Sequence, residues 1–201
     1  MPVTTLALTL ALATAAASAQ IATWYWTVSD TGNGDGLIEP GESAILTLWV
    51  SFEPRQDQFG GGFAWAGPYG IIGNSAWANG TVDDRANLLD GHGFFDDGSL
   101  DGANNILAVE HFQLPEFFQQ GFMIRDNPID LFFIRWTPTA YTLQTVTLDN
   151  AGPNANIYTD EWGTNIPYSG AGGSVTFHVV PAPASAAAFG LCALGALRRR
   201  R

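Results

Sequence analysis

Short runs of alternating apolar and polar residues recur along this chain, separated by segments rich in Gly, Pro, Asn and Asp. The alternation is clearest in residues 43–52. There Leu46, Leu48, Val50 and Phe52 occupy one set of alternate positions, and Ile45, Thr47 and Trp49 occupy the other. Because successive side chains of a strand point to opposite faces, this pattern predicts a strand with one face in a core.

Six further segments have the β-branched and aromatic composition of strands: 22–29, 59–72, 105–114, 131–136, 141–148 and 174–180. Glycines interrupt residues 59–72, which predicts a bulged or bent strand. Residues 82–101 are predicted to be mostly acidic loop, with one helical turn near 83–89. No segment sustains helical periodicity beyond two turns. The pattern therefore predicts an all-β fold, a single antiparallel β-sandwich of the jelly-roll or immunoglobulin-like kind, over residues 20–179.

The last 22 residues differ from this pattern. Pro181 and Pro183 hold the backbone extended, and an uncharged run from 184 to 197 follows. The chain ends in four arginines: Arg198, Arg199, Arg200 and Arg201. A helix over the run would rise about 21 Å, which is short of a hydrocarbon core of about 30 Å. The positive-inside rule predicts that the arginines stay on the cytoplasmic side.

This stretch, residues 180–201, resembles the PEP-CTERM protein-sorting domain. In that family a Pro-Glu-Pro motif precedes a transmembrane run and a terminal arginine cluster, and here Ala182 stands in place of the glutamate. The resemblance implies transient anchoring in the inner membrane and cleavage by an exosortase. It also implies delivery to the envelope, outer surface or extracellular matrix of a Gram-negative-type bacterium.

Residues 1–19 have the features of a secretory signal peptide. An apolar core covers 6–17, and Ala17-Ser18-Ala19 supplies the small-x-small pattern before a predicted cleavage ahead of Gln20. We therefore expect the Sec translocon and a signal peptidase to handle the chain. An N-terminal export signal and a C-terminal sorting signal are consistent with each other, because the second is useless without the first.

The net charge of -11 understates the acidity of the body. All 19 acids lie between Asp30 and Glu161, and four of the eight arginines lie in the tail, which leaves the body with four arginines and a charge of -15. Such a body repels nucleic acid and anionic lipid, so we expect no nucleic-acid partner. The only cysteine, Cys192, lies in the tail. A disulfide, a thiolate metal site and a cysteine nucleophile are thereby excluded from the body.

A loop rich in Gly and Asp, residues 30–42, precedes the strand 43–52. Its sequence NGDGLIEPGES resembles the opening of immunoglobulin-like or cohesin-like surface modules. The resemblance implies a body of that kind.

Two segments place oxygen-bearing side chains at alternate positions and end in Asp-Gly. The first has Asp30, Thr31, Asn33, Asp35 and Glu42, and the second has Asp97, Ser99 and Asp101. Oxygens that converge on one centre suit Ca²⁺, the one cofactor that the sequence suggests. No flanking helices are predicted, which argues against a true EF-hand. The alternative interpretation is a pair of Asx-rich turns between strands.

Tryptophans suggest a second kind of site. Trp24, Trp26 and Trp49 lie on predicted strands and are expected in the core or on a sheet face. Three others lie in segments rich in Gly and Asn and are candidates for stacking on sugar rings: Trp65, Trp77 and Trp162.

Catalytic motifs are missing from the sequence. No predicted strand carries the paired carboxylates of a glycosidase, and neither a G-x-S-x-G elbow nor a phosphate loop occurs. We expect a non-catalytic structural or adhesive module of the envelope or matrix. A carbohydrate-binding module acting on exopolysaccharide is the alternative, and a secreted hydrolase is a more distant one.

Overall fold

The computed structural model describes residues 21–53, 63–65, 69–88, 93–113, 128–150, 155–158 and 165–181. These residues form thirteen strands and one short 3-10 helix, so the all-β prediction is confirmed. The elements are β1 (Ile21–Asp30), β2 (Leu37–Ile38), β3 (Ala44–Glu53), β4 (Phe63–Trp65), β5 (Tyr69–Gly73), η1 (Trp77–Asn79), β6 (Gly80–Asn87), β7 (Gly93–Leu100), β8 (Ile106–Gln113), β9 (Ile129–Pro138), β10 (Gln144–Asn150), β11 (Ala155–Tyr158), β12 (Asn165–Ala171) and β13 (Ser174–Val179).

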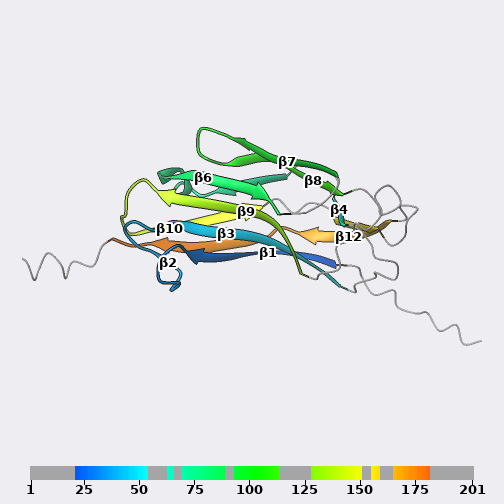
Figure 1. The fold of residues 1–201 in the computed structure, drawn as a ribbon, viewed down its shortest axis with the longest axis horizontal. Coiled ribbons are helices and arrows are strands. Elements are labelled where there is room, and N and C mark those ends of the chain that lie inside the picture. The colour runs from blue at the N-terminus through cyan, green and yellow to red at the C-terminus, as the bar shows by residue number, and fades with distance from the viewer. Residues whose placement is uncertain are drawn as a thin grey trace, which may run out of the picture.

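The strands form two layers that face each other, which confirms the predicted sandwich (Figure 1). The first layer has the order β1-β3-β9-β6 and is antiparallel throughout. The second has the order β2-β13-β10-β5-β8-β7, with β2 and β13 parallel. Strands β4, β11 and β12 continue from β8 and return to β1, where β12 pairs in parallel with residues 21–23. The two layers are therefore joined along one edge.

Alternation along β1 and β3 decides which side chains enter the core. On β3 the predicted inner residues Leu46, Leu48 and Val50 are fully buried, while the alternate residues are half-buried. On β1 the inner residues include Trp24 and Trp26. Burial of a large apolar side chain contributes about 1.5–3 kcal/mol, so this alternation fixes the register of the layer.

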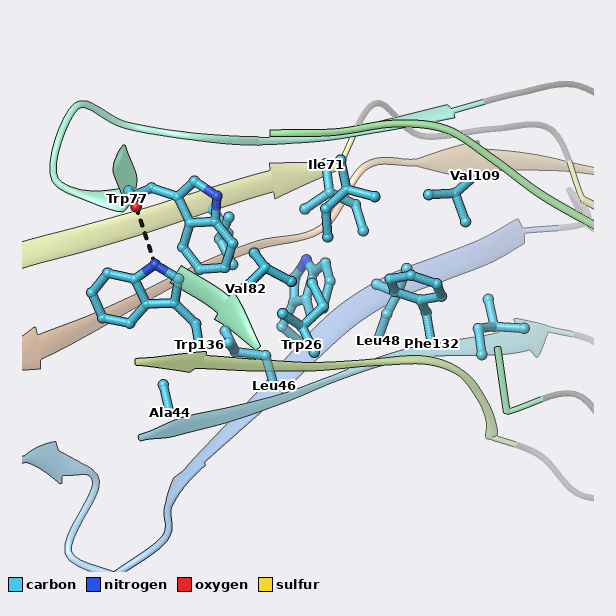
Figure 2. Packing of buried hydrophobic residues seen from close by; sticks show 14 of the residues in the cluster. Trp26, Ala44, Leu46, Leu48, Ile71, Trp77, Val82, Val109, Phe132 and Trp136 are labelled. Carbon is cyan, nitrogen blue, oxygen red and sulfur yellow. Dashed lines mark hydrogen bonds between the residues drawn. The ribbon is translucent and has the colours of Figure 1, made fainter. Parts of the chain in front are cut away.

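Strand β9 departs from strict alternation by one bulge. Its pairing with β3 shifts by one residue between Leu48 and Trp49. As a result, the neighbouring residues Leu131 and Phe132 are both fully buried. The extra residue turns both apolar side chains toward the core. Figure 2 shows the core side chains filling the space between the layers.

The prediction of a loop over 82–101 was wrong. Strand β6 pairs with β9, and β7 pairs with β8. Both strands lie at the edge of their layer, and of the residues in β6 only Gly80 and Val82 are buried. An edge strand with mostly polar side chains carries little apolar periodicity, which explains the error.

The remaining strand predictions concern the bend in residues 59–72 and the strands near the C-terminal end of the body. The predicted bend in 59–72 is confirmed at its end, where the register of β5 against β8 shifts between Tyr69 and Ile71. Strands β11 and β12 were not predicted.

Several predictions concern parts of the chain outside the described residues. These parts are the side chain of Phe52, the signal peptide and residues 182–201. In the part of the chain that the structure describes, no helix is long and apolar enough to cross a membrane.

Candidate binding faces and loops

The first acidic loop is closed by its own hydrogen bonds. One carboxylate oxygen of Asp30 accepts the backbone N–H groups of Gly32 and Gly34, both at 2.8 Å, and the other accepts that of Gly36 at 2.9 Å. These bonds favour the charged form, and they lower the pKa of Asp30 below its usual 3.8. Gly34 and Gly36 have φ of +79° and +80°, so glycine permits this wrapping of the loop around the carboxylate.

The remaining oxygens of that loop bond in the same way. Asn33 accepts from the N–H of Asp35, and Asp35 accepts from that of Leu37, both over two residues, as in Asx turns. Thr31 accepts from Ser43 at 3.0 Å, and Glu42 accepts from Glu39 at 3.0 Å. The five side chains predicted as calcium ligands therefore each accept at least one backbone N–H.

The second predicted loop is in part a strand. Asp97 and Ser99 lie on β7, and only Asp101 lies in a turn. Asp97 accepts the N–H of Asn87 on β6, whereas Asp101 accepts those of Ala103 and Asn105. Hydrogen bonds from Asn105 and Ala103 lower the pKa of Asp101. The assignment of this whole segment to one loop was therefore wrong.

In neither segment do carboxylates cluster around one point. Across the described residues no group of three or more His, Cys, Asp or Glu side chains is placed to hold a metal ion. Calcium binding stays a prediction, and the geometry agrees with the alternative interpretation of Asx turns.

Trp77 is not exposed, and its assignment as a sugar-stacking residue is wrong. It is fully buried at one end of the sandwich, where it stacks on Trp136 with ring centroids 5.4 Å apart. Its Nε1 donates to the carbonyl of Asn104 at 2.7 Å, and its carbonyl accepts from Trp136 Nε1 at 3.0 Å, the bond drawn in Figure 2. The Gly- and Asn-rich surroundings suggested a loop, but the short helix η1 carries the indole into the core.

The other two candidate tryptophans are Trp65 and Trp162. Trp65 lies on β4, but its side chain is outside the described residues, as is the whole of Trp162. The sorting residues beyond Pro181 and the predicted signal cleavage at Gln20 are also outside them. These assignments stay predictions.

One histidine lies in the core. His111 on β8 is fully buried, and its Nε2 lies 3.0 Å from the hydroxyl of Tyr69 on β5. Phe132 approaches the imidazole edge-on at 6.0 Å between ring centroids. Burial lowers the pKa of His111 from 6.5 to about 4 and raises that of Tyr69 well above 10. Both side chains are therefore neutral near pH 7.

The outer face of the first layer carries a partly exposed aromatic pair, which we call the Tyr25–Trp49 pair. The two residues lie directly opposite each other on β1 and β3, with rings 6.4 Å apart and nearly parallel at 10°. Tyr25 is 36% exposed and Trp49 is half-buried. Trp49 fits its predicted place on a sheet face. Tyr25 was missed, because only the register of β1 against β3 brings it to Trp49.

The outer face of the second layer is different. Ile72 of β5 and Leu107 of β8 are 44% and 38% exposed, and both lie next to Gly70. On the neighbouring strands β10 and β13, Thr147 and Thr176 lie opposite each other and are joined by a 3.0 Å hydrogen bond. This face exposes only a few aliphatic side chains among the described residues, which are common on protein surfaces and indicate no site.

Comparisons with known proteins give structural likeness only. No family model matches the chain, and no curated protein matches it. A solved cohesin module from a Clostridium perfringens family 33 glycoside hydrolase has 12% identity and a TM-score of 0.46, covering 79% of this chain and 97% of that one. A non-cellulosomal cohesin from the hyperthermophilic archaeon Archaeoglobus fulgidus has 14% identity and a TM-score of 0.38, covering 81% and 92%. At such low scores the likeness carries no argument about family or function.

Proposed function

We propose that this chain is a non-catalytic structural or adhesive module of the cell envelope or extracellular matrix of a Gram-negative-type bacterium. It reaches its place through the Sec translocon and signal peptidase and is then processed by an exosortase. The two ends of the sequence support the route, and the β-sandwich supports the role.

The observation that carries the non-catalytic assignment is where the shifted pKa values occur. Catalytic acids and bases have perturbed pKa values in accessible clefts. Among the described residues, the shifts belong to Asp30 and Asp101, which close loops, and to Tyr69 and His111, which are buried. Each shift has a cause in the scaffold, and none marks an accessible acid–base pair.

A second candidate function, carbohydrate binding, is favoured by one observation. The Tyr25–Trp49 pair offers one exposed and one half-buried ring on a regular sheet face, whereas Trp77 is buried and cannot stack on a sugar. A carbohydrate-binding module would be a special case of the adhesive role.

The sorting route is tested by replacing Arg198–Arg201 with serine in the full chain. We expect unprocessed precursor to accumulate or the protein to be misplaced, because the positive cluster would no longer hold the tail on the cytoplasmic side. Immunoblots of membrane, surface and medium fractions measure this.

The matched control replaces the same four arginines with lysine, which keeps the charge. Processing of the lysine variant together with failure of the serine variant would show that charge is what the route requires. An unchanged size and location of the serine variant would refute the proposed route.

A further inference from the structure

The Tyr25–Trp49 pair is held in place by the sheet around it. Trp49 Nε1 donates to the hydroxyl of Thr27 at 3.0 Å, which ties the indole of β3 to β1. The indole N–H is thereby satisfied, and the ring does not depend on a ligand for its position. Two rings fixed on adjacent antiparallel strands form a preorganised apolar surface, for which binding has little ordering entropy to overcome.

Hydroxyl groups flank the pair on both sides along the strands. Thr27 lies opposite Thr47 on one side, and Thr23 lies opposite Ser51 on the other. All four alternate with the inward-facing residues and so belong to the outer face, the two of β1 exposed and the two of β3 half-buried. The face therefore reads hydroxyl pair, aromatic pair, hydroxyl pair from one end to the other.

On the two strands of the pair the outward side chains around it are uncharged, and charge begins on the next strand. The next strand, β9, places exposed Asp130 opposite Trp49 and exposed Arg135 opposite Ile45. Between β1 and β3 the outward residues from Thr23 to Ser29 and from Ile45 to Ser51 carry no charge. In a body of net charge -15, an uncharged aromatic and hydroxyl surface is a local exception.

We propose that this face binds an uncharged polysaccharide, with the Tyr25–Trp49 pair stacking on its sugar rings. The proposal rests on the proposed function and names the partner of the adhesive module. A pyranose presents an apolar face of C–H groups and a rim of hydroxyls, which matches aromatic rings flanked by Thr and Ser. Charge complementarity favours a neutral chain, because the acidic body repels uronate- or sulfate-bearing ones.

Binding of the full chain to neutral hexasaccharides tests the proposal by isothermal titration calorimetry. The probes are cellohexaose, laminarihexaose, maltohexaose and mannohexaose, with the anionic hexagalacturonate for comparison. We expect at least one neutral probe to bind and hexagalacturonate not to bind. Trp49→Ala and Tyr25→Ala should each weaken binding by about tenfold or more. Raising NaCl from 50 to 500 mM should leave the affinity unchanged, because a neutral ligand is not screened.

Matched variants separate binding from folding. Ile72→Ala removes an exposed apolar side chain from the other layer and should keep full affinity. Tyr25→Phe and Trp49→Phe keep a ring and should retain most of it. Thr27→Val removes the acceptor that orients Trp49 and should give an intermediate loss with an unchanged melting temperature. This last result is not expected of a merely structural pair.

Three results would overturn the proposal. The first is that none of the neutral probes binds, and the second is that both alanine variants bind as the wild type does. The third is dimerisation in sedimentation that Trp49→Ala abolishes, which would assign the face to a second copy of the chain. If such a result came with normal sorting to the surface, the glycan proposal alone would fail. Failure of sorting would instead count against the proposed function.

Discussion

Two tryptophans close one end of the sandwich. Trp77 and Trp136 stack there, and each indole is hydrogen-bonded. A Cβ at Gly73 would come within 2.2 Å of Trp77, and one at Gly80 within 2.0 Å of Trp136. These glycines therefore serve close packing of the indoles. The glycines that suggested an open loop around Trp77 are therefore the residues that leave room for both indoles in the core.

Trp77→Ala should lower the free energy of unfolding by about 3–5 kcal/mol, because it removes a fully buried indole and leaves a cavity. Urea denaturation measures the change. Trp49→Ala serves as the control and should lower it by less, about 1–2 kcal/mol, since it loses one cross-strand pair and one exposed hydrogen bond on a face. Equal losses for the two variants would contradict the assignment of Trp77 to the core.

His111 makes stability depend on pH. Its pKa is about 4 in the folded protein, where burial disfavours the charged form, and about 6.5 in the unfolded chain. The unfolded state therefore binds more protons between these values. Stability is fully present above pH 6.5 and is lost as the pH falls toward 4, by about 3 kcal/mol in all.

The free energy of unfolding at pH 7.5 and at pH 4.5 measures this effect. We expect the difference to shrink in His111→Gln, which has no titrating group. The lowered pKa values of Asp30 and Asp101 affect stability at lower pH than His111 does. The stability that these two carboxylates contribute is lost only as the pH falls below about 3.8. A wild-type slope that His111→Gln retains would assign the effect to other groups.

At the scale of elements, a clasp joins the free edges of the two layers. Arg85 of β6 donates to the carbonyls of Asp97 and Gly98 on β7, at 2.9 and 2.8 Å. The N–H of Asn87 returns a bond to the Asp97 carboxylate at 2.8 Å. An open edge exposes unpaired backbone groups to other chains, and the guanidinium covers two of these carbonyls.

Arg85→Lys should lower the free energy of unfolding by about 1–2 kcal/mol, because a lysine cannot reproduce the two-point fork. Amide hydrogen exchange in β7 should speed up at the same time. Arg135→Lys, an exposed arginine of β9, is the control and should be neutral. No difference between the two variants would mean that the clasp contributes nothing to stability.

The loop of residues 30–42 is organised by a carboxylate that faces backbone N–H groups. Asp30→Ala should lower the melting temperature in EDTA, because three N–H groups lose their acceptor. Calcium is tested on the same two proteins. If the loop binds it, millimolar Ca²⁺ gives heat in calorimetry and raises the melting temperature of the wild type but not of the variant. Absence of both effects in the wild type would end the calcium prediction.

The elements that the sequence revealed are those with two different faces. Strands β1 and β3 were predictable because buried and outward residues alternate along them, and β9 because of its β-branched and aromatic composition. Strands β6 and β7 were not, because their stability comes from neighbours and edge contacts such as that of Arg85. The Asp30 loop was recognised from its residues, but whether its oxygens meet a cation or the backbone depends on φ values at Gly34 and Gly36. The Tyr25–Trp49 pair could not be predicted from the sequence, because only the register of β1 against β3 brings the two side chains together.

At the scale of the whole molecule, the body is acidic and offers two unlike outer faces. One layer carries the uncharged Tyr25–Trp49 pair, and the other carries a few exposed aliphatic residues beside the hydrogen-bonded Thr147 and Thr176. Strong net charge keeps such a module soluble and separate from its copies. An uncharged face within it would let the module attach to a neutral polysaccharide in one orientation, which agrees with the proposed display on a surface.

The proposed function requires that this module is exported, trimmed at both ends and retained outside the cell. Intact-mass spectrometry of the protein recovered from the native cell surface or matrix tests it most directly. We expect a chain that begins at Gln20 and lacks the arginine cluster Arg198–Arg201. A full-length chain from Met1 to Arg201, recovered from the cytoplasm, would contradict it.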